Sequence, residues 1–223
     1  MGRTGCFSAR ALAFFDGLEE DNSRSYWEAH HDVFDAEIRL PLAALLESLP
    51  AAYQPFRVFR MNRDLRFTKD KSPYKLQHSA IHGGRGIDHY VQIGAGGLLA
   101  ASGAYAMERD QLDRYRAAVD DGRSGRALER LLARVGPVAS SDGMGMESLK
   151  TAPRGYARDH PRIELLRRKG VVVHGTLSGR DLADGEAARG FILAVFEAAE
   201  PLNRWLDKQV GPSERSDEDA APR

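Results

Sequence analysis

Hydrophobic and polar positions follow two different periods along the chain, and the change of period separates helical parts from strand-rich parts. Apolar residues recur at helical spacing near the N-terminus and again in the second half of the chain. This spacing predicts helices over Ala9–Glu20, about Arg24–Leu40, Pro41–Leu49, Glu108–Val119, Leu128–Val135, Pro161–Arg168 and Ala187–Val210. Pro201 predicts a break in the last helix, because proline removes a backbone donor.

Apolar runs that fit strands, separated by glycine turns, characterise the middle of the chain. We interpret Phe56–Phe67 as a strand that is followed by a loop at Lys69–Tyr74. Further strands are predicted at Leu76–His82, Ile87–Ile93, Leu98–Met107 and Val171–Leu177. Glycine turns between consecutive strands indicate an antiparallel meander.

The order of these elements predicts the fold class. Helices, then a run of strands, then helices and one late strand are typical of an α+β protein rather than of regular βαβ alternation. We predict an antiparallel sheet packed by N-terminal and C-terminal helices, in a single domain that spans residues 1–210. Residues 211–223 are polar and lack apolar anchors, which predicts a disordered tail.

Composition and charge narrow the class of protein. The 32 basic and 32 acidic residues give a formal net charge of zero, which argues against a nucleic-acid coat or a polybasic membrane surface. The chain has one cysteine, Cys6, no apolar run of membrane-spanning length and no apolar signal-peptide core. We therefore expect a cytoplasmic protein without a membrane partner, and the sequence does not indicate its oligomeric state.

Positive charge is concentrated in the segment Arg57–Lys75, which holds seven Lys or Arg residues and two Asp residues. In an extended segment Arg60, Asp64 and Arg66 share one polar face, where opposite charges can pair. Guanidinium and ammonium groups on a turn also suit a phosphate or a carboxylate. Two interpretations stay open, namely a site for an anionic ligand and a structural network of ion pairs without a ligand.

A second basic element lies at Lys150–Arg154, where proline and glycine predict turns, and His160 follows it. Our hypothesis is that both elements converge on one cleft that binds a small phosphate- or carboxylate-bearing ligand. The ligand-binding candidates are Arg60, Arg63, Arg66, Lys69, Lys71, Lys75 and Arg154. The alternative is that Arg154 and His160 cap chain ends and pair with acidic helices.

Catalytic chemistry has weaker support in the sequence. His160 is a candidate acid–base group because an imidazole titrates close to neutral pH, and Asp64 is a candidate partner for hydrolase-like chemistry. We predict no metal site and no cofactor, because the chain lacks a His-Glu-x-x-His pattern, a cysteine cluster and a nucleotide-binding glycine motif. The alternative function is a nucleic-acid or protein interaction module, although the balanced charge disfavours nucleic acid.

Several segments together resemble a known family. They are Leu18–Arg24 with Trp27 and His30, Arg63–Lys75, Gln111–Leu112 with Tyr115–Arg116, and Leu149–Tyr156 with Asp159–Pro161. The resemblance is to the uncharacterised family called domain of unknown function 2461, and it spans nearly the whole chain. Asp21 and Thr68 are mild departures from the asparagine and serine that are usual there. The family has no established activity, so the resemblance implies no catalytic residue but indicates which segments belong together.

Overall fold

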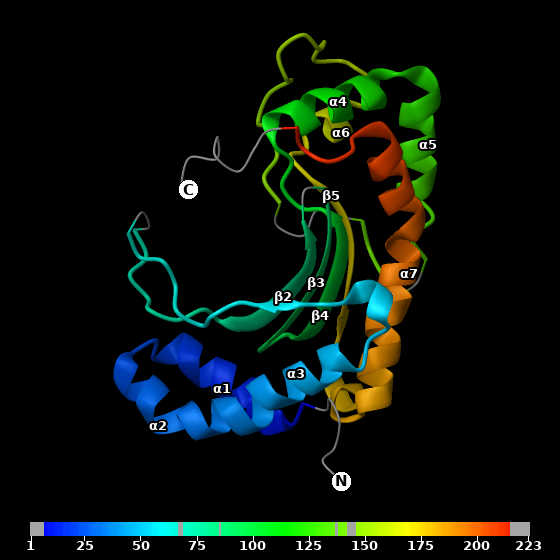
Figure 1. Ribbon diagram of the computed structural model, residues 1–223. Helices are drawn as coiled ribbons and strands as arrows, with labels where there is room; N and C mark the ends of the chain where they lie inside the picture. Colours follow the sequence, from blue (N-terminus) through cyan, green and yellow to red (C-terminus); the bar gives the residue numbers. More distant parts are fainter. Residues whose placement is uncertain (1–6, 67–68, 85, 137, 142–145, 215–223) are drawn as a thin grey trace. The chain divides into compact units, whose positions relative to one another are not determined.

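The protein combines helices with a five-stranded sheet, and the computed structural model in Figure 1 describes residues 7–66, 69–84, 86–136, 138–141 and 146–214. The strands are β1 (Arg57–Val58), β2 (Gln77–Gly84), β3 (Ile87–Gly94), β4 (Gly97–Ala104) and β5 (Val171–Leu177). Their order in the sheet is β1-β2-β3-β4-β5, so each strand lies beside its neighbour in sequence. The predicted α+β class and its antiparallel sheet are confirmed.

The helices fall before, within and after the series of strands. They are α1 (Ala9–Glu20), α2 (Arg24–Phe34), α3 (Leu40–Glu47), α4 (Arg109–Asp120), α5 (Gly122–Leu132), α6 (Ile163–Arg167) and α7 (Gly185–Gln209). Ser8 and Ser23 begin the first two helices, because their hydroxyl oxygens accept the backbone N–H groups of Arg10 and Tyr26.

Three predictions about elements are wrong. The predicted boundary before Pro41 does not occur, because the π-helical turn Asp35–Arg39 joins α2 to α3. Pro201 lies inside α7 without ending it, since buried Ala199 and Leu202 beside it keep the helix packed. Of the strand predicted at Phe56–Phe67, β1 alone forms; the chain beyond it is irregular, and Phe67 lies outside the described residues.

The chain folds into two compact units, and neither is a continuous stretch of sequence. The first unit holds residues 1–82, 90–100 and 175–194, and the second holds 83–89, 101–174 and 195–223. Strands β2 to β5 and helix α7 each contribute residues to both units. The boundary at residue 210 and the single domain therefore stay predictions, and residues 215–223 of the predicted tail lie outside the described part.

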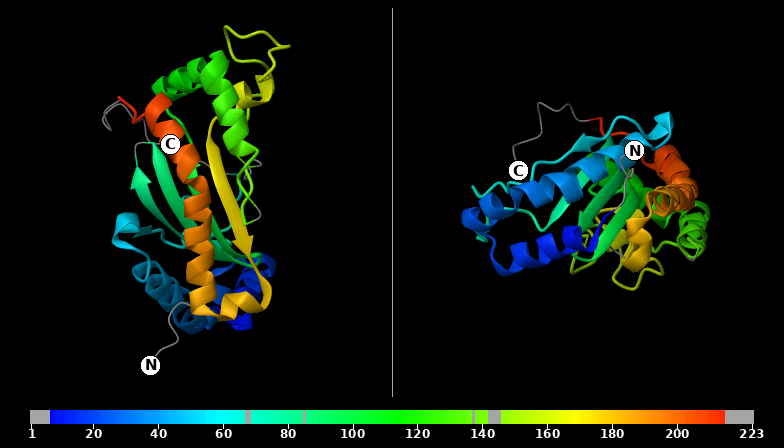
Figure 2. Two further views of the ribbon diagram at one scale, coloured as in Figure 1. Left: turned by 90° about the vertical axis from the view of Figure 1, so that its right-hand side faces the viewer. Right: turned by 90° about the horizontal axis from the view of Figure 1, so that it is seen from below.

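In the first unit, aromatic side chains fill the space between the N-terminal helices, and Figures 1 and 2 show α1 and α3 side by side. The ring of Phe14 contacts the rings of Tyr26, Trp27 and Phe34, with centroids 5.7 to 6.0 Å apart. A Cβ at Gly17 would lie 2.3 Å from the Tyr26 hydroxyl oxygen, so the absence of a side chain there lets Tyr26 donate to the Phe14 carbonyl.

In the second unit, α4, α5 and α6 pack with the C-terminal part of α7, as the left view of Figure 2 shows. Tyr115 of α4 is fully buried and its hydroxyl donates to the Leu165 carbonyl oxygen at 3.1 Å. Burial raises the pKa of the Tyr115 phenol, so this hydroxyl stays protonated and acts as a donor. The ring of Trp205 meets Tyr115 edge-on, with centroids 6.2 Å apart.

Gly103 provides a test of how closely β4 and β5 approach. Its φ is +140°, and an added Cβ would lie 2.4 Å from the Val171 carbonyl oxygen and 2.8 Å from Val172 Cα. Because both atoms belong to the backbone, we expect Gly103→Ala to lower the free energy of unfolding by about 2–4 kcal/mol. Chemical denaturation measures this, with Gly96→Ala as the control, since no atom lies within 4 Å of its added Cβ. Equal free energies of unfolding for the two variants would contradict a close approach of the β4 and β5 backbones at Gly103.

Candidate functional site

The central basic segment folds back on itself between β1 and β2, as Figure 1 shows. Asn62 and Tyr74 form an isolated antiparallel bridge. Beside it the Arg63 N–H donates to the Pro73 carbonyl at 2.9 Å, and the Lys75 N–H donates to the Met61 carbonyl at 2.9 Å. Residues 61–63 and 73–75 are thus a short antiparallel pair, and the described residues between them, 64–66 and 69–72, belong to its loop.

Asn22, in the turn between α1 and α2, binds the backbone of Tyr74 in the central segment. Its Nδ2 donates to the Tyr74 carbonyl at 3.1 Å, and its Oδ1 accepts the Tyr74 N–H at 3.0 Å. Trp27 of α2 stacks on the Tyr74 ring, with centroids 4.6 Å apart and 12° between the planes. Two of the segments that carry the family resemblance are therefore in direct contact.

The loop of the central segment pairs most of its own charges. The Arg66 Nη2 donates to Asp64 Oδ2 at 2.7 Å and its Nε donates to Asp64 Oδ1 at 3.0 Å. Arg63 pairs with Asp70, and Lys71 Nζ donates to the Leu65 carbonyl at 2.9 Å. These contacts give Arg63, Arg66 and Lys71 local partners.

Hydrogen bonds hold the two loop carboxylates in their charged form. The Arg66 side chain and backbone N–H lower the pKa of Asp64 to about 2. Donation from the Ser72 hydroxyl and N–H, followed by Arg63, lowers the pKa of Asp70 to about 2. Both carboxylates are therefore ionised at neutral pH and already accept protein donors.

Three other cations, Arg57, Arg60 and Lys75, form what we call the basic cluster, in which two cations lie at the ring of Phe59 and the charge of Arg60 acts on Lys75. Arg57 Cζ lies 4.7 Å and Lys75 Nζ lies 5.2 Å from the centroid of the Phe59 ring. Burial, and then the charge of Arg60, lower the pKa of Lys75. Within the described residues, none of these three side chains forms an ion pair or a side-chain hydrogen bond, although the charge of Arg60 contributes to the lowered pKa of Asp64.

The second basic element is anchored through His160. The His160 Nδ1 accepts the Arg162 N–H at 3.0 Å, so the neutral ring carries its proton on Nε2, which lies 3.0 Å from Asp120 Oδ1. Arg162 adds bonds from Nε to the Val119 carbonyl at 2.6 Å and from Nη2 to the Asp120 carbonyl at 2.9 Å. These contacts hold the loop before α6 to the C-terminal end of α4.

The predicted site residues are divided between the two units. Arg60, Arg63, Arg66, Lys69, Lys71, Lys75 and Asp64 lie in the first unit, whereas Arg154 and His160 lie in the second. Lys69 and Arg154 are exposed. The structure places each set within its own unit, so the convergence of the two sets stays a prediction.

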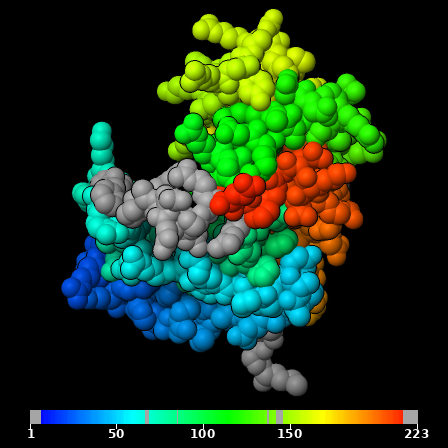
Figure 3. All heavy atoms as spheres, turned by 45° about the horizontal axis from the view of Figure 1, so that its top comes forward, coloured from blue at the N-terminus to red at the C-terminus, as the bar shows by residue number. Residues whose placement is uncertain are grey.

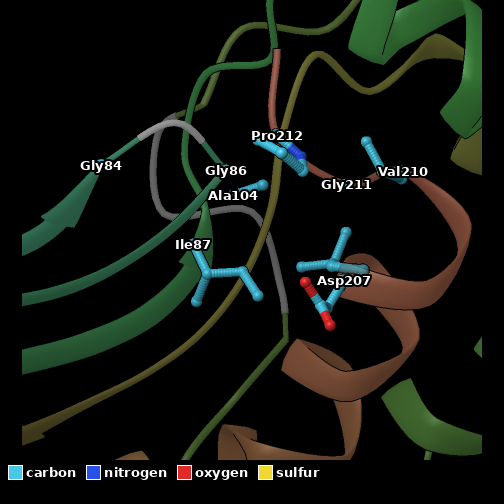
Figure 4. Close-up of a pocket in the computed structure, with 9 residues that line it drawn as sticks. Gly84, Gly86, Ile87, Ala104, Asp207, Val210, Gly211 and Pro212 are labelled. Carbon is cyan, nitrogen blue, oxygen red and sulfur yellow. The ribbon is translucent and has the colours of Figure 1, made fainter. Parts of the chain in front are cut away.

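Two cavities in the second unit differ in charge. One, of about 240 Å³, lies where the β2–β3 turn meets the end of α7, and Figure 4 shows Ile87 and Asp207 on opposite sides of it. Asp207 is the one charged side chain among the described residues that line it. The other, of about 310 Å³, is lined by Lys150, Thr151, Ala152, Arg158, Ile163, Glu164 and Arg167.

Sequence reasoning missed Arg57, Lys150, Arg158 and Arg167 as ligand-binding candidates. The available signals were sequence positions: Arg57 begins the segment Arg57–Lys75, and Arg158 lies between Lys150–Arg154 and His160. Within the described part of the chain, no group of three or more His, Cys, Asp and Glu residues is placed to hold a metal ion. None of the described helices is both long enough and apolar enough to cross a membrane.

The antiparallel sheet, its helices and the clustered basic side chains define an α+β protein with positively charged surface sites. Residues 10–205 match the family model DUF2461, which is described as a conserved hypothetical protein. The chain belongs to this family, and the matched range includes both basic elements. No curated protein and no solved structure matches the chain.

We expect Asn22→Ala to lower the free energy of unfolding by about 1–3 kcal/mol, because it leaves the N–H and the carbonyl of buried Tyr74 without these partners. Chemical denaturation measures the loss. The second variant, Asn22→Asp, removes only the bond to the carbonyl, since a carboxylate accepts the N–H but donates nothing to the carbonyl. Wild-type stability in both variants would contradict a clamp at Tyr74.

His78 of β2 is a buried histidine of the first unit, three residues after Lys75 in the sequence. Its side chain is 4 % exposed, its ring meets Phe34 edge-on at 5.1 Å, and neither nitrogen has a hydrogen-bond partner among the described residues. Burial, followed by the charges of Arg39 and Lys75, lowers its pKa to about 4. The imidazole is therefore neutral at pH 7.

The folded pKa of His78 lies below the unfolded value of 6.5. The contribution of the neutral imidazole to the free energy of unfolding is therefore fully present above about pH 6.5 and is lost as the pH falls toward 4. We expect the His78→Leu variant to unfold with a free energy within about 1 kcal/mol of wild type at pH 7.5. At pH 4.5 it should be about 2–3 kcal/mol more stable than wild type. Denaturation at the two pH values measures this; a constant difference between the proteins would contradict a neutral buried imidazole.

Proposed function

We propose that the protein binds a small ligand that carries a phosphate or a carboxylate at the basic cluster of Arg57, Arg60 and Lys75. The observation that supports this most directly is that Arg57 and Lys75 lie at the Phe59 ring while the charge of Arg60 acts on Lys75, and that no described carboxylate forms an ion pair with any of the three. Like charges at short range repel, and an anion between them would relieve that repulsion. Lysine and arginine also provide several donors to oxygen atoms of one anionic group.

The paired arginines of the loop have a different role in this proposal. Arg63 and Arg66 each bind a carboxylate of the same loop, so they support the shape of the segment. These ion pairs give part of the motif a structural role, because a fixed loop positions the basic cluster that lies beside the loop. Of the side chains predicted for the ligand, Arg60 and Lys75 are kept, and Arg57 is added.

The proposal is limited to binding, because the two catalytic candidates are engaged elsewhere. Both nitrogens of His160 take part in hydrogen bonds, to Asp120 and to the Arg162 N–H. Asp64, with its pKa lowered to about 2, is a weak base and is held by Arg66. A catalytic base would have to release one of these contacts first.

The test is a double variant, Arg60→Gln with Lys75→Met, titrated with citrate and inorganic phosphate by calorimetry at low salt. We expect its affinity to be weaker than wild type by roughly tenfold or more, since each charged contact to the anion contributes at least that much. Its thermal stability should equal or exceed that of wild type, because the substitution removes repulsion between like charges.

The matched control is Arg204→Gln with Lys208→Met, which removes the same charge from two exposed positions of α7, outside the unit that holds the basic cluster. We expect this control to bind within about threefold of wild type and to keep its thermal stability. Loss of stability in the Arg60→Gln/Lys75→Met variant, together with no binding by wild type, would favour a purely structural network. Tighter, strongly salt-dependent binding of a single-stranded oligonucleotide would favour a nucleic-acid surface instead.

A further inference from the structure

We propose that the 310 Å³ cavity of the second unit, which we call the α6 hollow, binds the dianionic phosphoryl group of a small phosphate monoester. Its lining includes Lys150, Arg158 and Arg167 together with one acid, Glu164. This inference is independent of the basic cluster, because it rests on other residues and on a cavity in the other unit.

One wall of the α6 hollow is joined to α6 by backbone and side-chain hydrogen bonds. The Leu149 N–H donates to the Arg167 carbonyl at 2.8 Å, and Arg167 Nε donates to the Leu149 carbonyl at 2.5 Å. This reciprocal pair places Lys150, the next residue, beside the C-terminal end of α6. The ammonium group therefore comes from a segment with a defined position.

Another part of the lining comes from a series of turns that is anchored at both ends. Pro153 is buried, Tyr156 packs on the core of the second unit, and His160 binds Asp120. Arg158 lies between the last two anchors. In the space-filling view of Figure 3, this yellow-green loop is at the surface beside the green helices α4 and α5, so a solute can reach it.

The charges that line the hollow match a doubly negative group. Three basic side chains and one acid leave a net charge of plus two. Arg167 pairs with Glu164 at 3.0 Å, while Lys150 and Arg158 are exposed and have no ion-pair or hydrogen-bond partner among the described residues. A phosphate monoester carries close to two negative charges at neutral pH, whereas a monocarboxylate carries one.

The remaining lining residues favour a small organic phosphate. Thr151 supplies a hydroxyl that can donate to a phosphoryl oxygen, and Ala152 and Ile163 offer apolar surface to a short organic body. The volume lies at the lower end of the range for small-molecule sites, roughly 300–1,000 Å³. A small monoester therefore fits both the size and the charge.

The test measures binding of phenyl phosphate to the full chain by ³¹P NMR titration. We expect Lys150→Ala and Arg158→Ala each to weaken binding by roughly tenfold or more. Arg154→Ala is the matched control, since it removes one positive charge from the same loop but lies outside the lining of the hollow. Its affinity should stay within about threefold of wild type. Glu164→Gln should bind more tightly than wild type, because it removes the one acid.

Several outcomes would overturn the inference. They are no saturation of wild type up to about 10 mM phenyl phosphate, unchanged affinity in Arg158→Ala, and an equal loss in Arg154→Ala. If acetate bound with the same affinity as phenyl phosphate, the hollow would have no preference for a dianion. If a 5′-phosphorylated oligonucleotide bound more tightly than phenyl phosphate, the ligand would be a nucleic acid and not a small molecule. In the Arg60→Gln/Lys75→Met variant, where the basic cluster no longer contributes to phosphate binding, Lys150→Ala and Arg158→Ala should cause the same losses, so this proposal and the proposed function fail separately.

Discussion

The contact between the Asn22 side chain and the backbone of Tyr74 holds the central segment in place in the first unit. An amide side chain has a donor and an acceptor side by side, so it satisfies a backbone N–H and a carbonyl at once, as a neighbouring strand would. The stack of Trp27 on Tyr74 fixes the same residue through its ring. With Tyr74 held, the antiparallel pair around it is defined, and so are the positions of Met61 and Lys75 within the segment.

Arginine has a second, recurring role in this fold, which is to bind carbonyl groups at helix C-termini. The last carbonyls of a helix have no intrahelical partner, and a guanidinium offers several donors of the favourable charge. Such bonds run from Arg189 to Ser48 at α3, from Arg162 to Val119 and Asp120 at α4, from Arg116 to Leu166 at α6, and from Arg114 to Val210 at α7. These contacts account for arginines that a count of charges would assign to the surface.

The sequence predicts the elements of regular period well, because burial on one face leaves a repeating pattern. The bounds of α1 and β5 match the prediction, and the meander follows from its glycine turns. The segment after β1 was predicted less well, since its charges pair within its own loop rather than across a strand ladder. Which arginine is paired depends on an acid reached through the turn, as Arg63 reaches Asp70, and periodicity carries no information about that.

Both candidate sites share one arrangement, in which an internal ion pair lies next to cations that form no ion pair of their own among the described residues. In the first unit the Arg66–Asp64 pair belongs to the same segment as Arg60 and Lys75. In the second, the Arg167–Glu164 pair lies in the same hollow as Lys150 and Arg158.

A chain with equal numbers of acids and bases has enough carboxylates to pair its cations. The lack of an ion pair in a basic cluster is therefore set by the local structure and not by a shortage of acids. Positive charge held together against its own repulsion lowers stability, and such a cost is typical of sites that are shaped for a ligand. The internal pair beside each cluster then has a clear physical role. It orients the backbone that carries the other cations and, in the described part of the chain, accepts no hydrogen bond from them.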